Sequence, residues 1–488
     1  MMILAVLAPA FIGFFILSFF VPTAFAVAGV LILSMTMGLF QNAGLPLALP
    51  KAVEESLMML LLFKAAVHVM ATSGRFRSPG WWAISGSVLC GAISALANDG
   101  GILVITLYVR NTLNFYLLFL AVMNLPLQPE QGRRLLLLVA GLFALQIPAG
   151  LIDFLINGIE EKYIGTVHES AGQLGLLIPM VATSFLFSAY LHTRGVRYLV
   201  GIMLFILFGV LGEKRATVFV VPTLLAILTA IYYVTPRPGR RSLRFTWRLL
   251  RQMLSAAVAT AVLGGMAFYM GARLLTSLNP DGAVGGRFDP AFVLDYAQRY
   301  NNRDFTSEFN GPDVTNTGVQ MGRFELLKCS FALMKNQDPF TVLFGHGGGF
   351  FSTSYLVGAD PEVFFERFQM RGTFPSMVVI LLESGFLGAA LYLAFHAYFA
   401  VRLYQKYRNS SGYYRIIGLG TLGMSLTFLF DTLSYSTVFA STGVLTPTYY
   451  LLAACLWSQP QIFSDLSKRH VAKLNAGFLY KHALRGGV

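Results

Sequence analysis

Long apolar stretches, separated by short polar turns, recur along the chain from its first residues to about residue 457. At a rise of 1.5 Å per residue, a helix of about 20 apolar residues crosses the roughly 30 Å hydrocarbon core of a bilayer. The pattern therefore predicts a series of transmembrane helices. The predicted spans are 3–20, 22–40, 56–72, 81–97, 102–124, 135–151, 173–192, 198–212, 217–234, 253–275, 374–398, 416–434 and 438–457.

The first two spans are the least distinct, because only Val21 and Pro22 separate them and no charge lies between them. They form either two crossings or one bent hairpin that does not fully cross. The stretch from Met1 to Phe20 does not resemble a cleaved signal peptide, since it lacks a basic start and a small-residue cleavage site. The predicted fold is an all-α polytopic membrane bundle of about 12–13 transmembrane helices.

The composition of the chain agrees with this fold. Apolar residues make up 56% of the 488 residues and charged residues only 12%, about half the roughly 25% of an average soluble domain. An ordinary soluble enzyme and a disordered chain are therefore excluded. Three cysteines (Cys90, Cys329 and Cys455) are too few for a disulfide scaffold.

The basic residues predict the orientation. If the loops are placed alternately on two sides, one set carries 21 of the 36 Lys and Arg residues, opposed only by Glu130 and Asp465. The positive-inside rule puts this set, and the C-terminus, in the cytoplasm. The net charge of +13 is thus explained by topology and lipid contact, and we predict no nucleic-acid partner. The set comprises 73–80, 125–134, 192–197, 235–252, 399–415 and the tail.

The opposite side carries short linkers, among them 41–55, and one long segment at about 276–373. Loops of that length are usually functional. Gln320 to Asn336 has helical spacing, with Phe324, Leu327, Phe331 and Met334 on one face, and predicts an amphipathic helix at the membrane surface. The predicted division is 1–275 with ten transmembrane helices, 276–373 as a large periplasmic loop, 374–457 with the C-terminal helices, and 458–488 as a basic cytoplasmic tail.

Several charged residues depart from this pattern. Glu213, Lys214 and Arg215 occupy a tight turn on the side that should avoid basic charge. They either reach lipid phosphates and pair with one another, or hold an anion rigidly between two helices. Ionisable residues inside predicted spans are expensive and by default face the bundle interior or pair with each other. These residues are Lys64, Arg110, Glu383 and Asp431.

Four segments in the second half of the chain resemble the O-antigen ligase and polymerase superfamily. They are 322–328 (Gly-Arg-Phe-Glu-Leu-Leu-Lys), 336–340 (Asn-Gln-Asp-Pro-Phe), 343–350 (Leu-Phe-Gly-His-Gly-Gly-Gly-Phe) and 381–388 (Leu-Leu-Glu-Ser-Gly-Phe-Leu-Gly). The family pattern reads roughly as Gly-Arg-x-x-x-Trp, a helix ending in Asn-Pro, a Gly-x-Gly-x-Gly loop and a helix ending near Glu-x-Gly-x-x-Gly. The family's His-Asn position is occupied here by residues around Thr373, Phe374 and Pro375, which favours a polymerase over a ligase.

This resemblance implies a membrane glycosyltransferase of the GT-C type in the bacterial inner membrane. It would use a glycan linked through pyrophosphate to a polyprenyl lipid, act on the periplasmic face and need no cofactor. Arginines stabilise a departing pyrophosphate without a metal, and no metal-ligand spacing is found. Arg215 and Arg323 are the first candidates for this role, and Lys214, Arg299, Arg303 and Arg371 are further candidates.

A general base must take the proton of the acceptor hydroxyl. His346 is the first candidate, because imidazole titrates near neutral pH and its glycine-rich surroundings allow close approach to substrate. The rivals for this role are Glu161, Glu169, His168 and Glu325. Aromatic and amide side chains suit sugars, and such side chains gather in the long outer segment at Tyr296, Tyr300, Asn301, Asn302 and Asn310.

Other interpretations stay open at this point. A ligase would transfer glycan to a lipid A core, and a flippase or secondary transporter also has about twelve spans and buried charges. The long outer loop and the absence of an internal repeat count against transport. A cell-wall glycosyltransferase of the shape, elongation and division type is a third possibility. The expected partners of a polymerase are its polyprenyl-linked substrate, membrane lipids, and a chain-length regulator and flippase of the same pathway.

Overall fold

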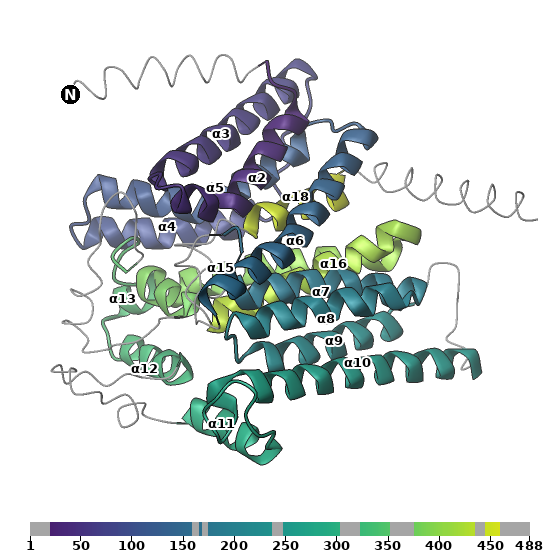
Figure 1. Ribbon diagram of the computed structural model, residues 1–488. Helices are drawn as coiled ribbons and strands as arrows, with labels where there is room; N and C mark the ends of the chain where they lie inside the picture. The colour runs from purple at the N-terminus through teal and green to yellow at the C-terminus, as the bar shows by residue number, and fades with distance from the viewer. Residues whose placement is uncertain are drawn as a thin grey trace, which may run out of the picture.

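The computed structural model describes residues 20–158, 165–167, 174–236, 247–302, 323–351, 375–434 and 445–458, and these residues form helices and connecting turns without a β-strand. Among them, eight helices are long and apolar enough to cross a membrane. The chain is therefore an all-α, multi-pass membrane protein (Figure 1). The eight helices are α2 (Thr23–Asn42), α5 (Ile102–Asn124), α6 (Pro129–Asn157), α7 (Leu174–Thr193), α9 (Thr217–Val234), α10 (Trp247–Leu274), α15 (Ser376–Asn409) and α16 (Gly412–Ser434).

Eight further helices are described. Four of them occupy predicted spans but are shorter or more charged than the eight above, and the other four are small helices that follow α10 in the chain. Every predicted span from 22–40 onward contains a helix, whereas span 3–20, apart from its last residue, lies outside the described residues. These helices are α3 (Ala48–Ala71), α4 (Trp81–Ala97), α8 (Val196–Leu211), α18 (Thr446–Ser458), η1 (Thr276–Leu278), α11 (Pro290–Asn302), α12 (Arg323–Lys335) and α13 (Pro339–Phe344).

Two helix starts differ from the sequence-based expectation. Helix α3 begins within the stretch 41–55, which was expected to be a linker, because Lys51 and Glu54 pair one turn apart along its first turns (Nζ to Oε2, 2.9 Å). Helix α6 begins at Pro129, before the apolar run, where Gln128 and Gln131 form a capping box. Charged and polar residues therefore extend both helices beyond their apolar segments.

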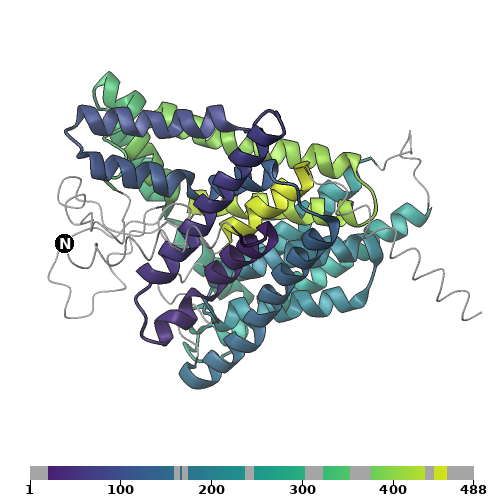
Figure 2. The ribbon, with the colours of Figure 1, turned by 90° about the horizontal axis from the view of Figure 1, so that it is seen from above.

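The connections gather at two ends of the bundle as the alternation of spans requires. Contacts join segments that were assigned to the basic side: Asn124 donates to the Arg77 carbonyl (2.9 Å), and Arg415 donates to the Thr235 carbonyl (3.3 Å). At the opposite end, Figure 1 shows α12 and α13 beside one end of α15, and α11 below the corresponding end of α10; Figure 2 shows the long helices of the bundle from above. Among the described residues, these two contacts thus lie at the other end of the bundle from α11, α12 and α13.

Aromatic rings fill the centre of the bundle where α5, α15 and α18 meet. Tyr116 lies edge-on to Phe395 with ring centroids 5.4 Å apart, and Phe119 lies 4.9 Å from Phe399. Small residues allow close packing elsewhere, as in membrane helix pairs generally: a Cβ on Gly423 of α16 would lie 2.7 Å from Ser184 of α7. This packing fixes α15, the helix that carries the candidate site.

Helix α12 forms over nearly the predicted residues, but it buries a different face. Leu326, Ser330 and Met334 are fully buried, whereas Phe331 is 40% exposed. The face predicted from Leu327, Phe331 and Met334 is therefore only partly correct. The reason is that α12 packs against α15. Phe331 contacts Phe386 of α15 at the exposed edge of this interface, with ring centroids 5.6 Å apart.

Candidate functional site

A break in α15 is the centre of the candidate site. Gly385 has φ 68° and ψ −173°, so the helix is interrupted within the segment that resembles the end of the family's conserved helix. The interruption leaves carbonyl groups without helical donors, and the glycine-rich segment supplies donors instead. The His346 amide donates to the Leu382 carbonyl (2.7 Å), and the Gly347 amide donates to the Glu383 carbonyl (3.2 Å).

Two glycines make this contact sterically feasible. A Cβ on Gly385 would lie 2.3 Å from the Leu343 carbonyl oxygen, and a Cβ on Gly345 would lie 2.5 Å from the Glu383 carbonyl carbon. Gly345 also has a positive φ of 82°, a conformation that side chains disfavour. Glycine is therefore needed at both positions, because a side chain would collide with the backbone of the other segment.

The segment 345–351, called here the glycine-rich loop, is also fixed to α4 and α5. Gly348 donates to the Gly91 carbonyl (2.8 Å), and the Ser94 hydroxyl donates to the Gly345 carbonyl (2.5 Å). A Cβ on Gly348 would lie 2.5 Å from the ring of Tyr108. The glycine-rich loop is thus held among three membrane helices that are distant from it in the sequence.

Glu383 and His346 lie on the two sides of this contact. Glu383 is only 3% exposed, and its Oε1 accepts from the Phe351 amide (2.9 Å). The ring of His346, the first candidate for the general base, is half-buried and lies edge-on to Phe351 with ring centroids 6.1 Å apart. The structure therefore brings the candidate base to the break in α15.

Helix α13 leads directly into the glycine-rich loop. Asp338 caps its first turn, accepting from the amides of Phe340 (3.0 Å) and Thr341 (3.1 Å). The hydrogen bonds from Thr341 hold the pKa of the Asp338 carboxyl below its usual range. Pro339 at the first helical position adds a fixed φ. The cap explains the Asn-Gln-Asp-Pro segment as a structural element that starts α13.

The turn between α8 and α9 holds the second group of candidates. Arg215 donates to the hydroxyl of Tyr296 in α11 (2.5 Å), and its guanidinium lies 5.6 Å from the centre of that ring. It also lies 3.9 Å from Glu213, whose φ is +51°. Lys214 is 9% exposed, with its stem against Gly175 of α7. The turn is therefore held by contacts with α7 and with α11 of the outer segment.

The structure places the other candidates to different extents. Arg323 and Glu325 lie in the first turn of α12, and Arg299, Tyr300 and Asn301 lie at the end of α11, but their side chains are outside the described part of the structure. Residues outside the described ranges altogether are Glu161, Arg303, Arg371 and the rivals His168 and Glu169. The convergence of Arg215 with Arg323 stays a prediction. Tyr296, which was noted only as one aromatic among several, is the residue that contacts Arg215.

The charged residues inside the predicted spans find varied partners. Arg110 of α5 forms a bidentate pair with Glu55 of α3 (Nη2 to Oε1, 2.5 Å, and Nε to Oε2, 2.9 Å), and Lys64 donates to the Val21 carbonyl. Glu54 is fully buried, and among the described residues its Oε1 has no hydrogen-bond partner. Hydropathy alone does not single out Glu54 and Glu55, because they precede the apolar run of α3.

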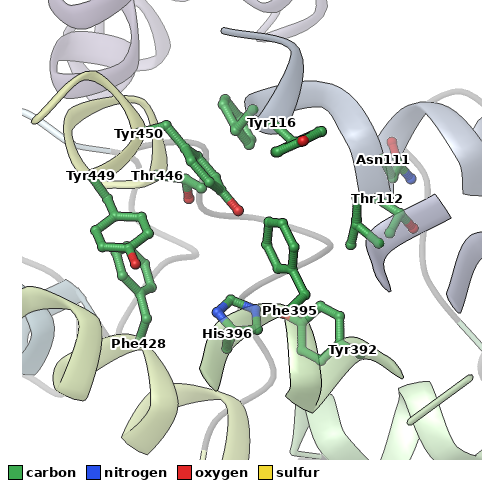
Figure 3. A pocket seen from close by; sticks show the side chains of 12 residues that line it. Asn111, Thr112, Tyr116, Tyr392, Phe395, His396, Phe428, Thr446, Tyr449 and Tyr450 are labelled. Carbon is green, nitrogen blue, oxygen red and sulfur yellow. The ribbon is translucent and has the colours of Figure 1, made fainter. Parts of the chain in front are cut away.

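A small cavity of about 30 Å³, room for about one water molecule, lies inside the bundle between α5, α15, α16 and α18 (Figure 3). His396 of α15 borders it, and among the described residues its Nε2 has no hydrogen-bond partner. Sequence reasoning missed this site; the only signal was the pairing of Tyr392 and His396 one turn apart. The lining also includes Asn111, Thr112, Tyr116, Phe395, Phe428, Thr446, Tyr449 and Tyr450.

Within the described ranges, no three His, Cys, Asp or Glu side chains lie close enough together to hold a metal ion. The geometry therefore offers two groups of polar residues at the outer end of the bundle: the glycine-rich loop with His346, and the turn with Lys214 and Arg215. No family model matches this chain, and no curated protein matches it either.

Proposed function

We propose that the chain is a bacterial inner-membrane polysaccharide polymerase that joins polyprenyl-pyrophosphate-linked oligosaccharide repeat units on the periplasmic face. The observation that carries this proposal is the contact between the glycine-rich loop and the break at Gly385. These are two of the four segments on which the superfamily resemblance rests, and they are adjacent in space. Their adjacency supports a shared role in one site.

In this proposal the acceptor hydroxyl attacks the anomeric carbon of the donor glycan. A bond forms between the acceptor oxygen and that carbon, the bond from that carbon to the pyrophosphate oxygen breaks, and His346 takes the hydroxyl proton. The pyrophosphate leaves on its polyprenyl carrier with its charge stabilised by Arg215 and Arg323. Lys214 strengthens the positive field at the turn, and Tyr296 orients Arg215.

The polysaccharide made by a strain that lacks this gene distinguishes the candidate functions. A polymerase is supported if single repeat units remain on the acceptor and all longer chains are lost. Full-length chains that accumulate on the polyprenyl carrier would instead identify a ligase. Repeat units trapped on the cytoplasmic leaflet would identify a flippase, and either of these two results would refute the polymerase.

The orientation in the membrane is a separate prediction. Cysteines introduced at Arg240 and Lys468 are expected to be cytoplasmic, and one at Asn301 periplasmic, because the basic loops favour the cytoplasmic side. In intact spheroplasts, with the three native cysteines replaced by serine, an impermeant thiol reagent should label only the cysteine at 301. Unlabelled positions should become reactive after the membrane is permeabilised. Labelling at 240 in intact cells would invert the whole topology.

Metal independence is the next prediction. If two or more basic side chains supply the charge stabilisation, the purified protein should keep its polymerising activity in excess EDTA. The control is a second aliquot to which Mg²⁺ or Mn²⁺ is added back after EDTA treatment. Activity that disappears with EDTA and returns only with the metal would contradict the proposed use of arginines.

A further inference from the structure

Glu383 is a buried acid in the membrane-spanning helix α15 and belongs to none of the candidate groups for acid–base or pyrophosphate chemistry. Only 3% of it is exposed. An ionisable group at such a place usually faces a polar partner and has a function. Here the partner is the backbone of the glycine-rich loop: the Phe351 amide donates to Oε1 of Glu383 (2.9 Å).

The same residue holds the loop at a second point through its backbone. The Glu383 carbonyl accepts from Gly347 (3.2 Å), and the preceding carbonyl, of Leu382, accepts from His346 (2.7 Å). Both carbonyls are accessible to the loop because α15 is interrupted two residues later, at Gly385. The carboxylate holds the end of the loop at Phe351, and the two carbonyls hold its start at His346 and Gly347. The loop is therefore held against α15 at both of its ends.

We infer that Glu383 is a positioning residue, which clamps the glycine-rich loop against the break in α15 and thereby orients His346. Its effect on glycan transfer rests on the proposed function, whereas its hold on the loop does not. Because the Phe351 amide needs only an oxygen acceptor, a glutamine at this position retains the clamp. A leucine, which is of similar size, removes this acceptor and leaves the Phe351 amide without its hydrogen bond to residue 383.

Hydrogen exchange of the purified full-length protein in detergent tests the clamp without any assay of activity. In Glu383→Leu, the Phe351 amide should exchange about 10- to 100-fold faster, since its hydrogen bond to a carboxylate is lost. The other amides of 345–351, which keep their backbone acceptors, should exchange faster by a smaller factor. In Glu383→Gln they should exchange as in the wild type. Ser184→Ala is the control, because the Ser184 hydroxyl donates to the Met180 carbonyl of its own helix, α7 (2.8 Å), away from the loop. Unchanged exchange in Glu383→Leu would overturn the inference.

Polymerisation kinetics then test whether the clamp positions His346. We expect Glu383→Leu to lower kcat at least about tenfold with KM nearly unchanged, and Glu383→Gln to restore kcat. If Glu383→Leu and Glu383→Gln lose kcat equally, although only Glu383→Leu exchanges its loop amides faster, the carboxylate does not act in glycan transfer as a clamp. If the wild-type protein forms no polymer while exchange follows the expected pattern, the proposed function fails and the clamp stands.

Discussion

Alanine in place of Arg215, or of Arg323, is expected to reduce polymer formation by about 100- to 1,000-fold, as the loss of an oxyanion-hole donor does. The departing pyrophosphate carries charge that must be stabilised as the glycosidic bond breaks, and a guanidinium provides two directed donors. Arg215 is already held in a rigid turn by Tyr296, so its position is set before the substrate arrives. Lysine at either position should recover little activity, because it lacks the bidentate geometry.

The chain offers a matched control for Arg215. Arg197 donates to the Tyr198 hydroxyl (3.0 Å) and lies 5.0 Å from the centre of that ring. It therefore forms the same kind of Arg–Tyr contact at the opposite end of the bundle. Arg197→Ala should keep wild-type polymer formation. Wild-type polymer from Arg215→Ala or Arg323→Ala would remove that residue from the mechanism, and wild-type polymer from both would favour a transporter.

The sequence predicts the helical bundle well because two simple physical requirements act on every span. A crossing helix needs an apolar run of a certain length, and basic residues favour one side of the membrane. These requirements explain why α4, α5 and α9 begin and end where the apolar runs do. Neither requirement detects a polar extension of a helix. For this reason the sequence places the first turns of α3 in a linker.

The candidate site is harder to predict because its contacts join segments far apart in the chain. The Ser94 hydroxyl and the Gly345 carbonyl are 251 residues apart in sequence. Glycines at 345 and 385 suggest tight backbone, but nothing in the pattern shows that they pack against each other. Likewise, Tyr296 carries no mark that distinguishes it from other tyrosines as the partner of Arg215. Such pairings follow from tertiary structure, which periodicity and composition do not determine.

The contact between the loop and α15 predicts a large effect for Gly385→Ala. A Cβ there would lie 2.3 Å from the Leu343 carbonyl oxygen, and the backbone has φ 68°. A positive φ with ψ near 180° costs about 1–3 kcal/mol for a residue with a side chain, and overpacking adds about 1–3 kcal/mol. We therefore expect destabilisation of about 2–6 kcal/mol, release of the glycine-rich loop and loss of polymer formation.

Two other glycines separate the causes of this effect. Gly282 has φ +60° with nothing within 4 Å of its Cβ position, and Gly265 lies in α10 with equally open space. Gly282→Ala should show only the conformational cost of about 1–2 kcal/mol, and Gly265→Ala should be neutral or stabilising by up to about 1 kcal/mol. The measurements are heat-induced unfolding in detergent and hydrogen exchange of 345–351. If Gly385→Ala unfolds no more easily than Gly282→Ala and keeps the loop protected, the close approach of the loop to α15 is refuted.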